Sequence, residues 1–172
     1  MDALYFSWNE PAARLLATGP DAAAFLQGQF SKDLRAGSGA ATYGLWLNHK
    51  GRVLADSFVL RRAEDVFEIV SVSSPAAGIV ERLESFIIAD DVSVADRTAG
   101  AVLLTTAGDP GDLFRGLGCV RPLEREFAIT SAGGLIFRGR AAGRHECWHV
   151  LLSDEVATTT ARAAIQDALD QA

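Results

Sequence analysis

A carboxylate stands in an otherwise apolar row of a predicted strand. Leu54, Asp56, Phe58 and Leu60 occupy alternate positions, and alternate side chains of a strand lie on the same face. Burying a carboxylate is costly unless it is paired, hydrogen-bonded or protonated, and pockets for polar ligands are common places for that exception. Asp56 is therefore a candidate functional residue. The alternative is that this part of the strand reaches solvent and Asp56 is simply hydrated.

The element that must position Asp56 is a predicted β-hairpin over residues 42–62. Two apolar runs flank the sequence NHKG at residues 48–51, and Asn and Gly favour tight chain reversals. Residues 66–72 supply a third strand after a polar turn at residues 64–65. Residues 42–72 therefore predict an antiparallel meander.

A second cluster of reactive residues lies near the C-terminal end of the sequence. His145, Cys147 and His149 are soft-metal ligand types at alternate positions, so a strand would place them on one face. Successive residues on that face are about 7 Å apart, too far for all three to bind one ion comfortably. The alternative is an edge strand with partly exposed imidazoles. A nucleophilic Cys147 has no identifiable orienting partner, and we expect no metal site.

Other signatures of catalysis are weak or missing. Asp90 and Asp91 are adjacent, and adjacent side chains of a strand point to opposite faces, so a solvated turn is favoured over a metal pair. The sequence contains no GxGxxG after a strand, no GxxxxGK[ST] phosphate loop and no GxSxG element of a serine hydrolase.

Helix signals occur at intervals along the chain. Residues 18–21 lead into a helix that we expect to break or bend at residues 27–29, because Gly28 disfavours a helix interior. Ser74 and Pro75 predict another helix start, with Ser74 as the N-cap and Pro75 in the first turn. A short helix is expected near residues 112–115, and a final helix after residues 153–155.

Strands and helices together predict an α+β fold of antiparallel sheets with packed helices. Residues 3–7 and 13–18 predict two strands around a turn. Further strands are expected near residues 92–94, 101–105, 135–138 and 147–152, with a turn at residues 141–144 before the last. The side chains expected in the core are Leu26, Leu45, Leu47, Leu54, Phe58, Leu60, Ile69, Leu83 and Phe86. Trp46 lies opposite Leu45 and Leu47 in the alternation, so it would cover a second face or meet a partner.

Composition is that of a soluble globular protein. The 172 residues are 49% hydrophobic and 22% charged, with a net charge of −6, which argues weakly against a broad nucleic-acid surface. Two distant cysteines favour reduced thiols and a cytoplasmic location. No stretch has the pattern of a signal peptide or a membrane span.

Several of these residues recur together in a known superfamily. Residues 25–29 (FLQGQ), Asp33, Tyr43 and Asn48-x-x-Gly51 with Asp56 resemble the N-terminal half of the folate-binding YgfZ and glycine-cleavage T-protein (aminomethyltransferase) superfamily. The resemblance covers roughly residues 13–98. The later strands and helix are compatible with it more loosely, and the chain stops about where the first half of the family stops.

The resemblance implies a curved α+β protein that binds tetrahydrofolate. It places Asp56 as the acidic residue that orients the folate and assists group transfer, which makes it the candidate catalytic residue. Tyr43 and Asn48 would lie near the pterin ring. Lys50 or Arg52 would meet a carboxylate of the glutamate tail. The implied cofactor-binding set is Tyr43, Asn48, Lys50, Gly51, Arg52 and Asp56.

The sequence departs from the family at two places. Arg52 stands where T-proteins have a second glycine, and Ala55-Asp56 stands where they have two aspartates. The Lys-Gly-Cys-Tyr-x-Gly-Gln-Glu motif of YgfZ-type proteins is absent, and neither Cys119 nor Cys147 replaces it. Whether the chain is an enzyme therefore stays open.

Three functions follow from the resemblance. One is a YgfZ-like folate-binding protein that supports one-carbon metabolism, iron–sulfur enzymes or tRNA modification. Another is an aminomethyltransferase-like subunit completed by a partner chain or by a homodimer, and the third is a noncatalytic scaffold. We expect residues 1–98 to form a folate-binding-like region and residues 99–172 a second α+β region.

Overall fold

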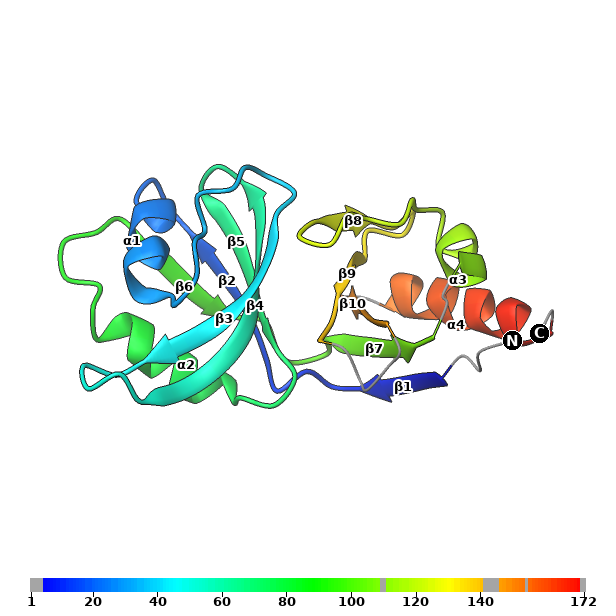
Figure 1. The fold of residues 1–172 in the computed structure, drawn as a ribbon, viewed down its shortest axis with the longest axis horizontal. Coiled ribbons are helices and arrows are strands. Elements are labelled where there is room, and N and C mark those ends of the chain that lie inside the picture. The colour runs from blue at the N-terminus through cyan, green and yellow to red at the C-terminus, as the bar shows by residue number, and fades with distance from the viewer. Residues whose placement is uncertain (1–4, 109–110, 141–145, 154, 171–172) are drawn as a thin grey trace. The chain divides into compact units, whose positions relative to one another are not determined.

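The computed structural model places two compact units along the chain, each built on an antiparallel sheet (Figure 1). The residues that it describes are 5–108, 111–140, 146–153 and 155–170. The first unit contains residues 11–99, and the second contains residues 1–10 and 100–172. Helices pack on one face of each sheet, so the fold is α+β as the sequence predicts.

The sheet of the first unit holds its strands in the order β3-β4-β5-β2-β6, with antiparallel neighbours throughout. The elements of this unit are β2 (Ala13–Thr18), α1 (Ala22–Gln29), β3 (Ala41–Leu47), β4 (Val53–Ala63), β5 (Val66–Ser71), α2 (Ala76–Glu84) and β6 (Ser93–Asp96). Strands β3, β4 and β5 form the meander predicted over residues 42–72.

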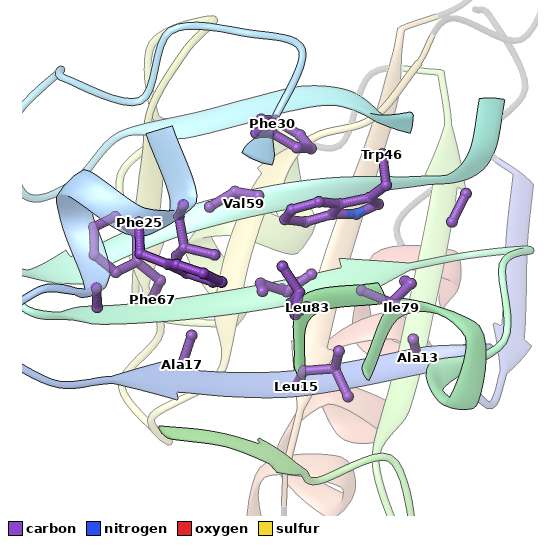
Figure 2. Close-up of a cluster of buried hydrophobic side chains, with 14 of the residues drawn as sticks. Ala13, Leu15, Ala17, Phe25, Phe30, Trp46, Val59, Phe67, Ile79 and Leu83 are labelled. Atoms are coloured by element: carbon purple, nitrogen blue, oxygen red, sulfur yellow. The ribbon is translucent and has the colours of Figure 1, made fainter. Parts of the chain in front are cut away.

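Trp46 belongs to the hydrophobic core of the first unit (Figure 2). It is fully buried, its ring centroid is 4.7 Å from that of Phe30, and its indole N–H donates to Ser57 Oγ over 2.9 Å. Helices α1 and α2 cover this face of the sheet with Phe25 and Leu83, among others. The expectation that Trp46 covers a second face or meets a partner is therefore wrong.

The predicted core is confirmed at five positions: Leu26, Phe58, Leu60, Ile69 and Leu83 are buried. Leu45 and Leu47 are half-buried. Leu54 and Phe86 are wrong, since 53% of Leu54 and 46% of Phe86 is exposed. Leu54 stands near the tip of the hairpin, and Phe86 lies beyond the last residue of α2.

One predicted helix end agrees with the structure, and one predicted helix start differs from it. Helix α1 includes Gly28 and ends at Gln29, the last residue of the range 27–29 where the sequence predicts a break or bend. Helix α2 begins at Ala76 with Pro75 as its N-cap, and no side chain caps it. The prediction of Ser74 as an N-cap is therefore wrong, and the Ser74 hydroxyl has another partner.

The sheet of the second unit has the strand order β1-β7-β10-β9-β8. The elements of this unit are β1 (Tyr5–Asn9), β7 (Val102–Ala107), α3 (Gly111–Gly116), β8 (Phe127–Ile129), β9 (Leu135–Arg138), β10 (Cys147–Leu152) and α4 (Glu155–Asp170). Helices α3 and α4 pack closely at Gly116, where an added Cβ would lie 2.8 Å from the Ala164 side chain. The sequence predicts each of these elements except the short strand β8.

Strand β1 belongs to the second unit although it precedes the first unit in the sequence. It pairs with β7, whereas β2 pairs with β5 and β6, so the two strands predicted near residues 3–7 and 13–18 are present but belong to different sheets. Strand β1, which the sequence analysis groups with residues 11–98, thus lies with the C-terminal elements. The turn expected at residues 141–144 lies outside the described residues.

Among the described residues, no helix combines the length and the apolar character needed to cross a membrane.

Candidate functional site

Asp56 and Tyr43 meet on one face of the β3-β4 hairpin. Asp56 stands opposite Leu45 in the register, and Tyr43 stands opposite Phe58, so the two polar residues are diagonal neighbours on adjacent strands. The Tyr43 hydroxyl donates to Asp56 Oδ2 over 2.9 Å. The Tyr43 ring packs against the Phe58 ring with a centroid separation of 5.0 Å. The hairpin therefore brings together two residues that the sequence analysis singles out.

A serine-rich segment between β5 and α2 supplies the remaining partners of Asp56. Ser74 Oγ donates to Asp56 Oδ1 over 2.6 Å and accepts the backbone N–H of Asp56 over 3.0 Å. The hydroxyls of Ser73 and Ser71 approach the same oxygen at 3.4 and 3.5 Å. Sequence reasoning missed these residues as site residues, because a serine before Pro75 has the pattern of a helix cap.

These hydrogen bonds keep Asp56 ionised. Partial burial alone would raise the pKa of the Asp56 carboxyl, but the hydrogen bonds from Ser74 and Tyr43 outweigh it and hold the pKa below its ordinary value. An ionised carboxylate is an acceptor only, with room for about four hydrogen bonds. Oδ2 accepts one, from Tyr43, within the part of the chain that the structure describes. No second hydrogen bond to Oδ2 is formed by the described residues.

Asn48 and Gly51 shape the tip of the hairpin. Asn48 Oδ1 accepts the backbone N–H groups of Lys50 at 2.9 Å and of Arg52 at 3.0 Å. Gly51 has a φ of +74°, a left-handed conformation that glycine adopts most readily, and its N–H donates to the Asn48 carbonyl. The amide oxygen of Asn48 thus serves the turn itself, which is a structural role that the sequence analysis does not assign.

Lys50 and Arg52 present two cations at this tip. Both residues are exposed. Arg52 precedes Asp56 by four residues, a distance of roughly 13 Å along an extended strand. The hairpin therefore offers an anionic group on its strand and cationic groups near its tip.

Arg82 connects α2 to the end of β3. Its Nε donates to the Leu47 carbonyl over 3.1 Å, and its guanidinium lies over the Phe86 ring at 3.9 Å from the centroid. Ser74, just before α2, is hydrogen-bonded to Asp56 of β4, and Arg82 of α2 is hydrogen-bonded to Leu47 of β3. The α2 segment therefore contacts both strands of the hairpin.

Two residues of the predicted cysteine and histidine cluster, Cys147 and His149, lie on β10 of the second unit. Cys147 and His149 are buried, and burial raises the pKa of the Cys147 thiol and lowers the pKa of His149 to about 4. His149 Nδ1 lies 2.9 Å from Thr105 Oγ1. A neutral thiol beside a neutral imidazole is not an activated nucleophile at neutral pH. His145 lies outside the described residues.

The structure offers no candidate metal centre in the regions that it describes. No group of three or more His, Cys, Asp or Glu side chains gathers there. Asp90 and Asp91 are exposed in an irregular segment, where the Asp91 backbone N–H donates to the Asp21 carboxylate over 2.8 Å. That arrangement matches the solvated turn expected from the sequence.

Comparison with known proteins identifies the family. The family model described as the GCVT N-terminal domain matches residues 10–110, more than half of the chain. The chain belongs to this family. The match includes the whole β3-β4 hairpin, with Asp56 and Tyr43, and the serine-rich segment that follows β5.

Solved structures share the fold at low sequence identity. The glycine cleavage system aminomethyltransferase T from Bartonella henselae aligns with 95% of this chain at 21% identity and a TM-score of 0.79. A chain of the heterotetrameric sarcosine oxidase from Corynebacterium sp. U-96 aligns with 95% at 17% identity and a TM-score of 0.65. This chain spans 46% of the aminomethyltransferase and 83% of the sarcosine oxidase chain. The GCVT fold therefore extends over both units.

Proposed function

We propose that this chain is a folate-binding protein that holds tetrahydrofolate against Asp56. The observation that carries the proposal is the ionised Asp56 carboxylate, oriented by Tyr43 and Ser74 in a chain of the GCVT family. An ionised acceptor with a remaining position at Oδ2 suits the N–H groups of a reduced pterin. These residues fit the ligand that the family resemblance implies.

The charged tail of a folate would set its orientation along the hairpin. Folates carry carboxylates on the glutamate tail, at the end opposite the pterin. The cations Lys50 and Arg52 stand beyond Asp56 toward the tip of the hairpin, where they would attract those carboxylates. Leu54, which is 53% exposed and lies between Arg52 and Asp56 in the sequence, would add an apolar contact between the two ends.

Bound tetrahydrofolate would supply a nitrogen that accepts a one-carbon unit. In an enzyme of this kind Asp56 would bind and orient the folate as the candidate catalytic residue, while Tyr43 keeps the carboxylate charged. A calorimetric titration of tetrahydrofolate into the chain tests the proposal. Saturable binding supports it, and a folded sample that takes up no tetrahydrofolate refutes it.

A second candidate function is an aminomethyltransferase-like subunit that works with a partner. This proposal rests on the fold that the chain shares with one chain of a heterotetrameric sarcosine oxidase, of which it covers 83%. A homodimer or a different partner chain would complete the enclosure of the ligand. Turnover of an aminomethyl donor by a strict monomer would rule out the need for a partner.

A YgfZ-like role in iron–sulfur enzyme maintenance or tRNA modification is the weaker form of the proposal, because the motif associated with it is missing from these 172 residues. A cytoplasmic location accompanies each form, supported by the free thiols of Cys119 and Cys147. A noncatalytic scaffold is the remaining alternative, and failure to bind tetrahydrofolate would favour it.

A further inference from the structure

Ser74 has the sequence pattern of a helix N-cap but does not cap a helix in the structure. A serine before Pro75 is typical of a helix N-cap, yet α2 starts at Ala76 and no side chain caps it. The Ser74 hydroxyl is instead bonded to Asp56, 18 residues earlier in the chain. The hydroxyl that could have capped α2 is thus hydrogen-bonded to a residue of the candidate site instead.

The bond between Ser74 and Asp56 runs in both directions. Ser74 Oγ accepts the Asp56 backbone N–H over 3.0 Å and donates its own proton to Asp56 Oδ1 over 2.6 Å. A serine hydroxyl has one donor and two acceptor positions, so one hydroxyl can do both. This pair of bonds fixes the carboxylate relative to the backbone of β4.

Ser74 is itself held in place from β5. The buried Ser71 hydroxyl accepts the backbone N–H of Ser74 over 2.9 Å, and that of Ser73 at 3.4 Å. The chain between β5 and α2 is therefore folded around Ser71 so that Ser74 faces Asp56. Ser73 is exposed, and its hydroxyl reaches the carboxylate only at 3.4 Å.

We propose that Ser74 is the positioning residue of this site: its hydroxyl sets the orientation of the Asp56 carboxylate, so that Oδ1 is occupied and Oδ2 faces Tyr43 and the ligand. The proposal concerns the orientation and ionisation of the Asp56 carboxylate in the free protein. It rests on the proposed function only for the identity of the ligand. Ser74 acts through Asp56 and is not itself assigned a contact with the ligand.

The test is the titration of the Asp56 carboxyl carbon by NMR in the full 172-residue chain. Ser74→Ala removes the donor of the shortest bond, and the Asp56 pKa is expected to rise by about one unit. Ser74→Thr keeps the hydroxyl and is expected to keep the low pKa. Ser73→Ala is the matched control, since it removes a longer contact from the neighbouring residue, and a smaller rise is expected.

A Ser74→Ala protein with an unchanged Asp56 pKa would overturn the proposal, and so would a Ser73→Ala protein with an equal rise. Ser74→Cys repeats the test with a side chain of similar shape and a weaker donor, in case the alanine variant does not fold. The Asp56 pKa of the Ser74→Cys protein must also rise. Tetrahydrofolate binding is then measured against pH for the same proteins. A raised pKa without any folate binding would support the role of Ser74 while refuting the proposed function.

Discussion

Tyr43 and Asp56 are joined across the β3-β4 hairpin by a hydrogen bond of 2.9 Å between the phenol and Oδ2. The bond is diagonal, and it depends on the register that places Asp56 opposite Leu45. A shift of one residue would turn Asp56 to the opposite face of the sheet. The hairpin register is therefore what assembles the site.

Tyr43→Phe is expected to move the pH dependence of folate binding. The Asp56 pKa is depressed in the folded protein, so the charged form persists until the pH falls through that pKa, and binding is lost there. Loss of the phenol raises the pKa, and binding should be lost at a higher pH, by roughly one unit. The contact between the ring at position 43 and the Phe58 ring remains in the variant. An unfolding temperature equal to that of the wild type is therefore the control for an intact fold. An acid limb at the wild-type pH would contradict the role of Tyr43.

His149 makes the stability of the protein depend on pH. Its pKa is lowered to about 4 by burial, below the ordinary 6.5 of the unfolded chain. Between these values the unfolded state binds the extra proton, so the contribution is complete above pH 6.5 and is lost as the pH falls toward 4. The slope is about 1.4 kcal/mol per pH unit. Urea unfolding from pH 7 to 4.5 measures it, and His149→Gln should flatten the profile. An equal slope in that variant would contradict the assignment.

The buried carboxylate of Glu68 stabilises the first unit through two arginines. Its side chain is fully buried and pairs with Arg14 at 2.6 Å and Arg62 at 3.3 Å. Glu68→Ala leaves the partly exposed Arg14 and Arg62 without this partner and removes two charge-assisted hydrogen bonds, so the free energy of unfolding should fall by about 2 kcal/mol. Asp33→Ala breaks the exposed pair with Arg35 and is expected to leave the denaturant midpoint unchanged. Equal effects of the two variants would contradict this account.

The cations at the hairpin tip are expected to recognise the tail of the ligand. The double variant Lys50→Gln and Arg52→Gln should bind tetrahydrofolate several-fold more weakly, and the difference should shrink at high salt because exposed charges are screened. A tetrahydropteroate ligand without the glutamate serves as the control and should bind both proteins alike. An equal loss of affinity for both ligands would point to damage of the hairpin instead.

The sequence was sufficient for the hairpin and for the face that Asp56 occupies. Alternation determines which side chains share a face, and the NHKG turn fixes where the strands reverse. It did not show that α1 and α2 cover the face of Trp46, since alternation distinguishes two faces without saying which one is covered. Trp46 was misplaced for that reason, and Leu54 because it stands near the tip of the hairpin.

Ser74 and Ser71 show the limit of local patterns. The sequence Ser-Pro before a helix predicts a cap from its neighbours alone, whereas the hydroxyl bonds a residue of β4 that only the folded sheet brings near. Asn48 shows the converse, because its bonds to Lys50 and Arg52 are local and follow from an Asx turn. Long-range partners of polar residues therefore required the structure.

The most direct test compares tetrahydrofolate binding by the wild type, Asp56→Asn and Asp33→Asn. Asp56→Asn keeps the shape of the side chain and removes its charge, while Asp33→Asn makes the same change at an exposed carboxylate paired with Arg35. The account predicts saturable binding by the wild type and by Asp33→Asn, and affinity at least about tenfold weaker for Asp56→Asn. Equal affinity of a folded Asp56→Asn protein would contradict the claim that Asp56 holds the ligand.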